Sequence, residues 1–237
     1  LEGRFYEIDC VFEVTGDVPA ITVIYPDGRS DLLESLMKAT ARHTNKEAYI
    51  ALLRETIERR LAAANGQRLR LLEVGVGDGL LAGQRAPGRK GRNVDYVATD
   101  LSRAFVLKAE AKAAAAGLDF LSFAVLDIAR DPGAQGFARE SFDLIICLDV
   151  VHATRRLAAT LGHLRTLLAP GGLLGVIEKV RTERWVDLVW GLAEGWWYFE
   201  DAEWRQHTPL LPAAAWERLL RGLDFSGVAV FPQTAAA

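Results

Sequence analysis

The chain has 237 residues, of which 50% are hydrophobic and 25% are charged, and its formal net charge is -3. This composition is typical of a globular protein with a sizeable core, and it excludes intrinsic disorder as the main state. The weak negative charge argues against a nucleic-acid partner. Two cysteines, Cys10 and Cys147, are too few for a disulfide framework or a thiolate metal site.

The chain shows neither an apolar run of membrane-spanning length nor a signal peptide. We therefore expect no membrane association and a cytoplasmic location. The first residue is Leu1 and the only methionine is Met37. We expect the chain to be a domain taken from a longer protein.

The sequence of residues 1–66 predicts an N-terminal region of strands and helices, which serves as a lid or lies at the edge of the main sheet. Apolar runs predict strands at 5–14 and 20–25, followed by a short helix at 31–38. A longer helix is predicted at 45–64, where apolar residues recur with helical spacing. We hypothesise that one of the two early strands extends the edge of the main sheet.

Residues 67–237 predict an α/β core of the Rossmann-like type. Apolar strands alternate with helices, which implies a mostly parallel sheet with helices on both faces. The predicted strands lie at 70–74, 94–99, 121–126, 143–148 and 173–179, with helices at 102–116 and 155–168. Later helices are predicted at 187–197 and 212–220, a last strand at 227–231, and an exposed basic loop at 83–93.

A glycine-rich loop follows the first core strand. Gly75, Gly77 and Gly79, with Val76 between the first two, would allow a tight turn and close approach of a ligand. The spacing lacks the pattern that makes room for a pyrophosphate. Glu73, two residues before the loop, disfavours a phosphate and suits a cation. These features predict S-adenosylmethionine, which carries a sulfonium and an ammonium group but no phosphate.

Acidic residues also end the second and third strands. Asp100 is predicted to accept hydrogen bonds from the ribose hydroxyls, with Leu101 beside it. Asp127 would accept a hydrogen bond from the adenine amino group, and Ile128 would pack on the ring. The alternative is that both aspartates cap the helices that follow them.

Several segments together resemble the S-adenosylmethionine-dependent methyltransferase domains of polyketide synthases, over about residues 68–225. The matching segments are 71–79, 99–102, 125–132, Gln135-Gly136-Phe137, 141–145, His152-Ala153-Thr154, 168–172 and 191–197. The resemblance implies a class I methyltransferase core without a metal. It also implies a substrate tethered through phosphopantetheine to an acyl carrier protein, other synthase domains in the same chain, and a role in secondary metabolism.

The resemblance also implies a catalytic pair, His152 and Glu178. If the fourth and fifth strands are adjacent, the two residues meet at one edge of the sheet, and the carboxylate would orient the imidazole as a general base. Two features depart from the family. Asp78 and Leu80 alter the glycine loop, and Asp149 stands where an asparagine commonly precedes the His-Ala-Thr motif. We include Asp149 among the cofactor residues.

All six tryptophans fall between positions 185 and 216. Trp196, Trp197 and Tyr198 are predicted to line a channel for the acyl chain. The alternative is that this aromatic segment packs into the core.

The favoured activity is methylation of an oxygen, the β-hydroxyl of a carrier-bound polyketide, because only about 65 residues precede the core and the glycine loop is altered. The alternative is methylation of the α-carbon of a β-ketoacyl intermediate, in which His152 removes the α-proton. The glycine spacing, Glu73 and the lack of a Tyr-x-x-x-Lys pair argue against a nicotinamide-dependent dehydrogenase. An inactive spacer domain is also unexpected, because the chain has all four candidate site residues Glu73, Asp100, His152 and Glu178.

Overall fold

The computed structural model describes residues 35, 46–77, 93–181, 186–187, 190–191 and 194–231. The strands predicted at 5–14 and 20–25 lie outside these residues, as does most of the predicted basic loop. So does the short helix predicted at 31–38, apart from Ser35, which is helical. The hypothesis of an added edge strand therefore stays a prediction.

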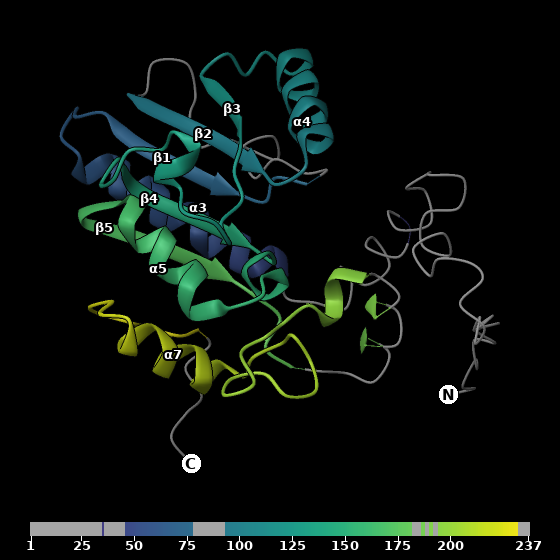
Figure 1. Ribbon diagram of the computed structural model, residues 1–237. Coiled ribbons are helices and arrows are strands. Elements are labelled where there is room, and N and C mark those ends of the chain that lie inside the picture. Colours follow the sequence, from purple (N-terminus) through teal and green to yellow (C-terminus); the bar gives the residue numbers. More distant parts are fainter. Residues whose placement is uncertain are drawn as a thin grey trace, which may run out of the picture.

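The core is a five-stranded, entirely parallel sheet in the order β3-β2-β1-β4-β5 (Figure 1). The strands are β1 (Leu69–Val74), β2 (Val94–Asp100), β3 (Leu121–Val125), β4 (Phe142–Leu148) and β5 (Leu168–Ile177). The strand order reverses between β1 and β4, and ligands of such sheets bind at the carboxyl ends beside this point. The structure confirms the predicted α/β fold class.

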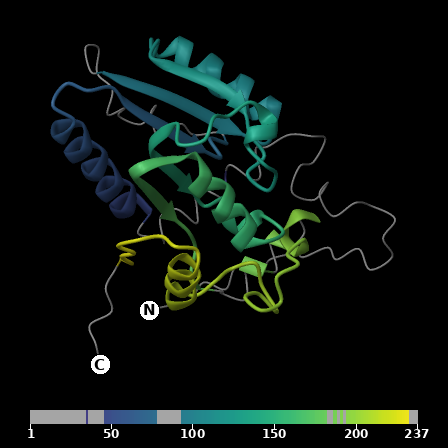
Figure 2. The ribbon, with the colours of Figure 1, turned by 60° about the vertical axis from the view of Figure 1, so that its left-hand side comes forward.

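Helices cover both faces of the sheet. Successive strand residues point to opposite faces, so Leu71 and Leu144 pack towards α3 (Lys46–Ala63) and α4 (Arg103–Ala115). Leu72 and Ile145 pack towards α5 (Leu157–Leu167) and α7 (Ala213–Gly222). Figure 2 shows α3 (purple) and α5 (green) on opposite sides of the sheet. Burial on both faces explains why the strands read as continuous apolar runs.

The fifth strand begins and ends earlier than predicted. It starts at Leu168, which pairs with Phe142, and a register shift follows before Leu173 pairs with Leu144. Gly171, with φ of 72°, makes this irregularity possible because glycine tolerates the left-handed region. The strand ends at Ile177, so Glu178 is the first residue after it.

Two predictions near the C-terminus are wrong. The predicted helix at 187–197 is not continuous, because Gly191 lies in a turn and Glu194–Trp197 forms the separate 3-10 helix η4. Gly191 lies so close to Trp197 that a Cβ there would be 2.7 Å from an indole carbon. The predicted strand at 227–231 is irregular, since no described strand pairs with it.

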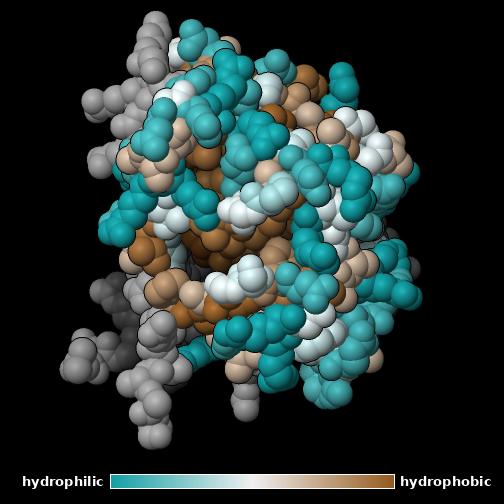
Figure 3. Space-filling model, turned by 90° about the vertical axis from the view of Figure 1, so that its left-hand side faces the viewer, coloured by the Kyte–Doolittle hydropathy of each residue, from teal (hydrophilic) through white to brown (hydrophobic). Residues whose placement is uncertain are grey.

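The surface carries both apolar and hydrophilic side chains. Figure 3 shows apolar side chains gathered in a hollow on the face that lies at the left of Figure 1, with hydrophilic residues around it. Among the described helices, none combines the length and the apolar character needed to cross a bilayer.

Candidate active site

The glycine loop turns sharply at the carboxyl end of β1. Gly75 and Gly77 have φ of 77° and 48°, and the N–H groups of Gly75 and Val76 both donate to the Thr99 carbonyl, at 2.8 and 3.0 Å. A Cβ on Gly75 would lie 2.8 Å from Cγ2 of Val150. Glycine is therefore required at this position. Val76 is buried, and Gly79 lies outside the described residues.

Asp100 ties the glycine loop to the end of β2. Its Oδ2 accepts a hydrogen bond from the Gly77 N–H (3.0 Å), and its Oδ1 accepts one from the Ser102 N–H (2.9 Å). Ser102 precedes α4, and within the described residues Asp100 accepts no hydrogen bond from an N–H group of the helix itself, so the structure does not support the capping alternative for Asp100. The neighbouring Leu101 is 67% exposed, which leaves an apolar side chain open at this edge.

Asp127 is held by a neighbour that the sequence did not single out as a site residue. The side-chain amide of Gln135 accepts a hydrogen bond from the Asp127 N–H and donates one to the Asp127 carbonyl, both at 2.9 Å. The Asp127 carboxylate accepts from the Ala129 N–H, but no helix begins there, so the capping alternative is wrong for this residue. Ile128 is buried, and Nδ1 of His163 lies 2.9 Å from its carbonyl oxygen.

Glu73 lies beneath the glycine loop, on the sheet face covered by α3 and α4. Its side chain is buried, and the Tyr96 hydroxyl donates to its Oε2 at 2.5 Å. Burial, together with the charge of Glu73, raises the pKa of Tyr96 well above 10, so the phenol stays a neutral donor. The role of Glu73 as a partner for a cationic ligand remains a prediction.

These residues fit a nucleoside without phosphate. Carboxylates suited to hydroxyl and amino groups lie at the ends of adjacent strands, at Asp100 and Asp127. The apolar Leu101 and Ile128 follow them, and Gly75 has no side chain that would keep a ligand away from the loop backbone. This combination agrees with the predicted S-adenosylmethionine.

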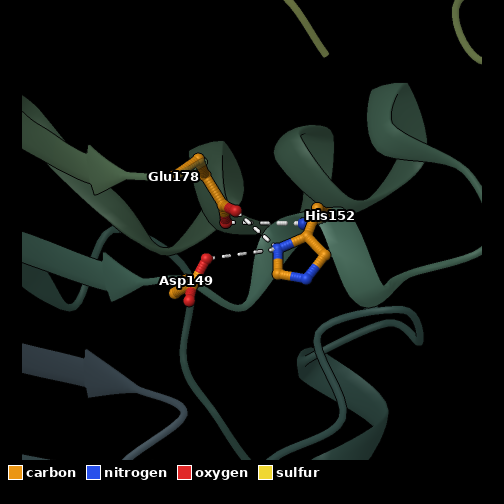
Figure 4. Close-up of side chains that lie close together, drawn as sticks. All are labelled: Asp149, His152 and Glu178. Atoms are coloured by element: carbon orange, nitrogen blue, oxygen red, sulfur yellow. Dashed lines mark hydrogen bonds and ion pairs between the residues drawn. The ribbon is translucent and has the colours of Figure 1, made fainter. Parts of the chain in front are cut away.

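The structure brings His152 and Glu178 together (Figure 4). His152 lies in the 3-10 helix η3 (Val151–Ala153) after β4, and its Nδ1 is 2.6 Å from Oε2 of Glu178. The other carboxylate oxygen, Oε1, accepts hydrogen bonds from the N–H groups of Val150 (3.0 Å), Val151 (2.6 Å) and His152 (3.4 Å). Both oxygens of this buried carboxylate thus act as acceptors. The arrangement requires a proton on Nδ1 and leaves Nε2 as the basic nitrogen.

The surroundings of His152 raise the pKa of its imidazole. Burial lowers the pKa of His152, but the charge of Glu178 and its hydrogen bond, with help from Asp149, outweigh this effect and raise the pKa above 6.5. Nε2 points away from both carboxylates (Figure 4). The indole of Trp196 packs edge-on against the ring, with 5.7 Å between centroids. This geometry can take up a proton at Nε2 and stabilise the imidazolium.

Asp149 lies beside this pair. Its φ is 56°, a conformation that Asn and Asp tolerate better than most residues, which explains why Asp can replace the family's asparagine. Its Oδ2 is 3.3 Å from the Lys179 ammonium, and its Oδ1 is 3.8 Å from Nδ1 of His152. Ligand atoms of Asp149, His152 and Glu178 lie within 4.8 Å of one another. A cation bound at Nδ1 would have to displace the hydrogen bond to Glu178.

The aromatic segment divides between the two predicted roles. Trp196 is buried, and its Nε1 donates to Asp187 at 3.0 Å, so the packing alternative describes it. Trp197 and Tyr198 are 48% and 46% exposed. The Arg155 guanidinium lies 5.1 Å from the centre of the Tyr198 ring. These two exposed aromatic residues remain candidates for substrate contact.

The sequence is similar to a methyltransferase family and to polyketide synthases. A family described as "Methyltransferase domain" matches residues 72–174. Polyketide synthase ThaG of Burkholderia thailandensis is 35% identical over 92% of this chain, and lovastatin diketide synthase lovF of Aspergillus terreus is 38% identical over 72%. The chain spans only 4% and 7% of the lengths of these two relatives.

Solved structures are also similar. The CurJ carbon methyltransferase is 34% identical, with a TM-score of 0.76 over 93% of this chain and 57% of that one. The DszA carbon methyltransferase is 35% identical, with a TM-score of 0.79 over 90% of this chain and 56% of that one. The trans-methyltransferase CalH, solved in complex with SAH, is 31% identical, with a TM-score of 0.69 over 90% of this chain and 56% of that one.

These comparisons correct one prediction. Oxygen methylation was favoured because the N-terminal region is short and the glycine loop is altered. The similar structures CurJ and DszA are carbon methyltransferases, so the preference for oxygen methylation is wrong.

Proposed function

Since this chain belongs to the class I methyltransferase domains of polyketide synthases, we propose that it methylates the α-carbon of a β-ketoacyl intermediate carried by an acyl carrier protein. S-adenosylmethionine is the cofactor. The observation that carries the proposal is the His152–Glu178 contact of 2.6 Å, in a fold similar to solved carbon methyltransferases.

His152 acts as the general base. With Nδ1 protonated and donating to Glu178, the free electron pair lies on Nε2, which takes the α-proton of the substrate. The broken C–H bond leaves its electron pair on the α-carbon, where the flanking carbonyl groups share it. The imidazolium is stabilised by the adjacent Glu178 and Asp149 carboxylates. To act as a base again, His152 must release the proton from Nε2 to solvent.

The cofactor would be held at the ends of β1, β2 and β3. Asp100 would bind the ribose, Asp127 and Ile128 the adenine, and the backbone around Gly75 and Gly77 the amino-acid part. When bound, S-adenosylmethionine would supply the electrophilic methyl group for the α-carbon, with the electron pair of the broken S–CH₃ bond staying on sulfur to give S-adenosylhomocysteine. Glu73 adds negative charge beneath the loop, which favours a cation over a phosphate.

The substrate would approach from the aromatic segment. Trp197 and Tyr198 offer exposed rings on the segment that packs against His152 through Trp196. We assign these two rings to the acyl chain and its phosphopantetheine arm. Other synthase domains in the same longer chain would supply the carrier protein and the β-ketoacyl group.

A substrate comparison tests the proposal. The chain is incubated with S-adenosylmethionine and carrier protein loaded with either a β-ketoacyl or a β-hydroxyacyl group, and mass spectrometry follows methyl addition. We expect the β-ketoacyl carrier to gain the methyl group and His152→Ala to slow this by at least about 100-fold. His207→Ala is the matched control, because His207 is exposed and lies outside the site. Methylation of the β-hydroxyacyl carrier alone, or a fully active His152→Ala variant, would contradict the proposal.

A further inference from the structure

Arg205 is a fully buried cation in the loop between η4 and α7. The exposed fraction of its side chain is 0%, and that of its partner Asp201 is 4%. Burying a guanidinium costs several kcal/mol unless its N–H groups and charge are satisfied. The contacts that satisfy it therefore identify what this side chain holds in place.

Its partners are the backbone of the segment that carries His152. Nη1 donates to the His152 carbonyl (2.8 Å), while Nη2 donates to the carbonyls of Thr154 (2.8 Å) and Arg155 (2.9 Å). Nε donates to Oδ1 of Asp201 at 2.6 Å. The rigid, planar fork of an arginine suits several acceptors at once, which the single ammonium of lysine does not match.

Asp201 extends the same connection into α5. Its second oxygen, Oδ2, accepts a hydrogen bond from the N–H of Leu157, the first residue of α5, at 2.8 Å. The two buried side chains thus hold backbone groups from residue 152 to residue 157. On the other side of His152, Glu178 holds the N–H groups of residues 150–152.

The same C-terminal segment also contacts the imidazole. Trp196 packs against the His152 ring, and the ring of Phe199 lies 5.4 Å from the Arg205 guanidinium. The Glu200 N–H donates to the Arg155 carbonyl at 2.8 Å. Residues 196–205 therefore contact His152 through its ring and through its backbone.

We propose that Arg205 and Asp201 are positioning residues for the base: they fix the backbone of residues 152–157 so that His152 keeps Nδ1 on Glu178 and Nε2 towards the substrate. The inference rests on the proposed function of His152 as a base. Neither residue has a predicted contact with substrate or cofactor, so both act through His152.

The test uses Arg205→Lys and Asp201→Asn in the full chain. Arg221→Lys is the matched control, because Arg221 also pairs with an acidic residue four positions earlier, Glu217, on the exposed surface of α7. For both test variants we expect kcat to fall by at least about tenfold, since small misplacement of a catalytic group is costly. Affinity for S-adenosylhomocysteine, measured by calorimetry, should change by less than about threefold, and the control should behave as the parent.

A second readout separates positioning from general stability. NMR titration of the His152 ring follows its pKa, which burial and Lys179 lower and Glu178 and Asp149 raise. In both test variants we expect this pKa to fall, because a looser backbone weakens the contact with Glu178 while the ring stays packed against Trp196. An unchanged titration with unchanged kcat would overturn the inference, and so would parallel losses of kcat, cofactor affinity and folded protein. The titration needs no turnover, so it remains decisive if the carbon-methylation assay itself fails.

Discussion

Replacing Glu178 with glutamine removes one acceptor atom from a place where the structure uses two. Oε1 accepts the N–H groups of Val150 and Val151, and Oε2 faces Nδ1 of His152. A glutamine has a single oxygen. If that oxygen faces the backbone, its NH₂ group faces Nδ1 and favours the tautomer with the proton on Nε2, which cannot accept the substrate proton. If it faces His152, the NH₂ group points at the three backbone N–H donors of residues 150–152.

Both orientations have a measurable cost. The wrong tautomer removes general-base assistance of about 10²–10⁴-fold. An unsatisfied buried donor costs about 1–3 kcal/mol, which lowers the melting temperature of a chain of this size by about 2–12 °C. We expect Glu178→Gln to lose at least about 100-fold in kcat while cofactor affinity is kept, measured by mass spectrometry and calorimetry. A kcat within threefold of the parent, with the protein folded, would refute this reasoning.

Glu178→Gln should also change how the reaction rate and the stability depend on pH. Because Glu178 raises the pKa of His152 above 6.5, the parent's rate should rise with pH through that raised value, as Nε2 loses its proton. The contact between His152 and Glu178 stabilises the folded chain fully at pH values below about 6.5, the pKa of histidine in the unfolded chain. This stabilisation is lost as the pH rises through the higher pKa of His152 in the folded chain. Glu178→Gln should therefore move the acid limb of the rate profile to lower pH and remove this component of stability, which thermal unfolding across pH measures.

Three further predictions follow from the site. Gly75→Ala should lower the free energy of unfolding by about 1–3 kcal/mol and weaken cofactor binding. Gly66→Ala is the control and should cost less, because Gly66 also has a positive φ (83°) but no atom lies within 4 Å of the new Cβ. Equal melting temperatures for the two variants would contradict the close approach of Gly75 to Val150. Gln135→Ala should weaken S-adenosylhomocysteine binding by about tenfold, through loss of both hydrogen bonds to Asp127; unchanged calorimetry would show that this clamp is dispensable. Treatment with EDTA should leave kcat unchanged, and activity restored only by a divalent metal would point to a catalytic cation instead.

The sheet was predictable because its signal is local. Strands buried on both faces read as apolar runs, and the order of strands and helices implies a parallel sheet. The early start of β5 was not predictable, since Leu168 extends the strand only by pairing with Phe142. The irregular segment at 227–231 shows the converse: its sequence suits a strand, but no described strand pairs with it.

The site was predictable in part for a similar reason. The family resemblance identified His152 and Glu178, and they could be placed together because adjacent parallel strands bring their carboxyl ends to one edge. Arg205 and Asp201 could not, because an arginine four residues after an acid looks like the exposed pair of Arg221 and Glu217. What distinguishes the buried pair is contact with carbonyls about 50 residues away along the chain.

The most direct measurement locates the transferred methyl group. The chain is supplied with S-adenosylmethionine labelled with ¹³C in its methyl group and with a carrier-bound β-ketoacyl substrate, and NMR identifies the atom that bears the label. We expect a carbon–carbon bond at the α-position in the product of the parent chain, and no such product from His152→Ala. A label attached to oxygen, or an α-methyl product formed equally well without the imidazole, would contradict the account.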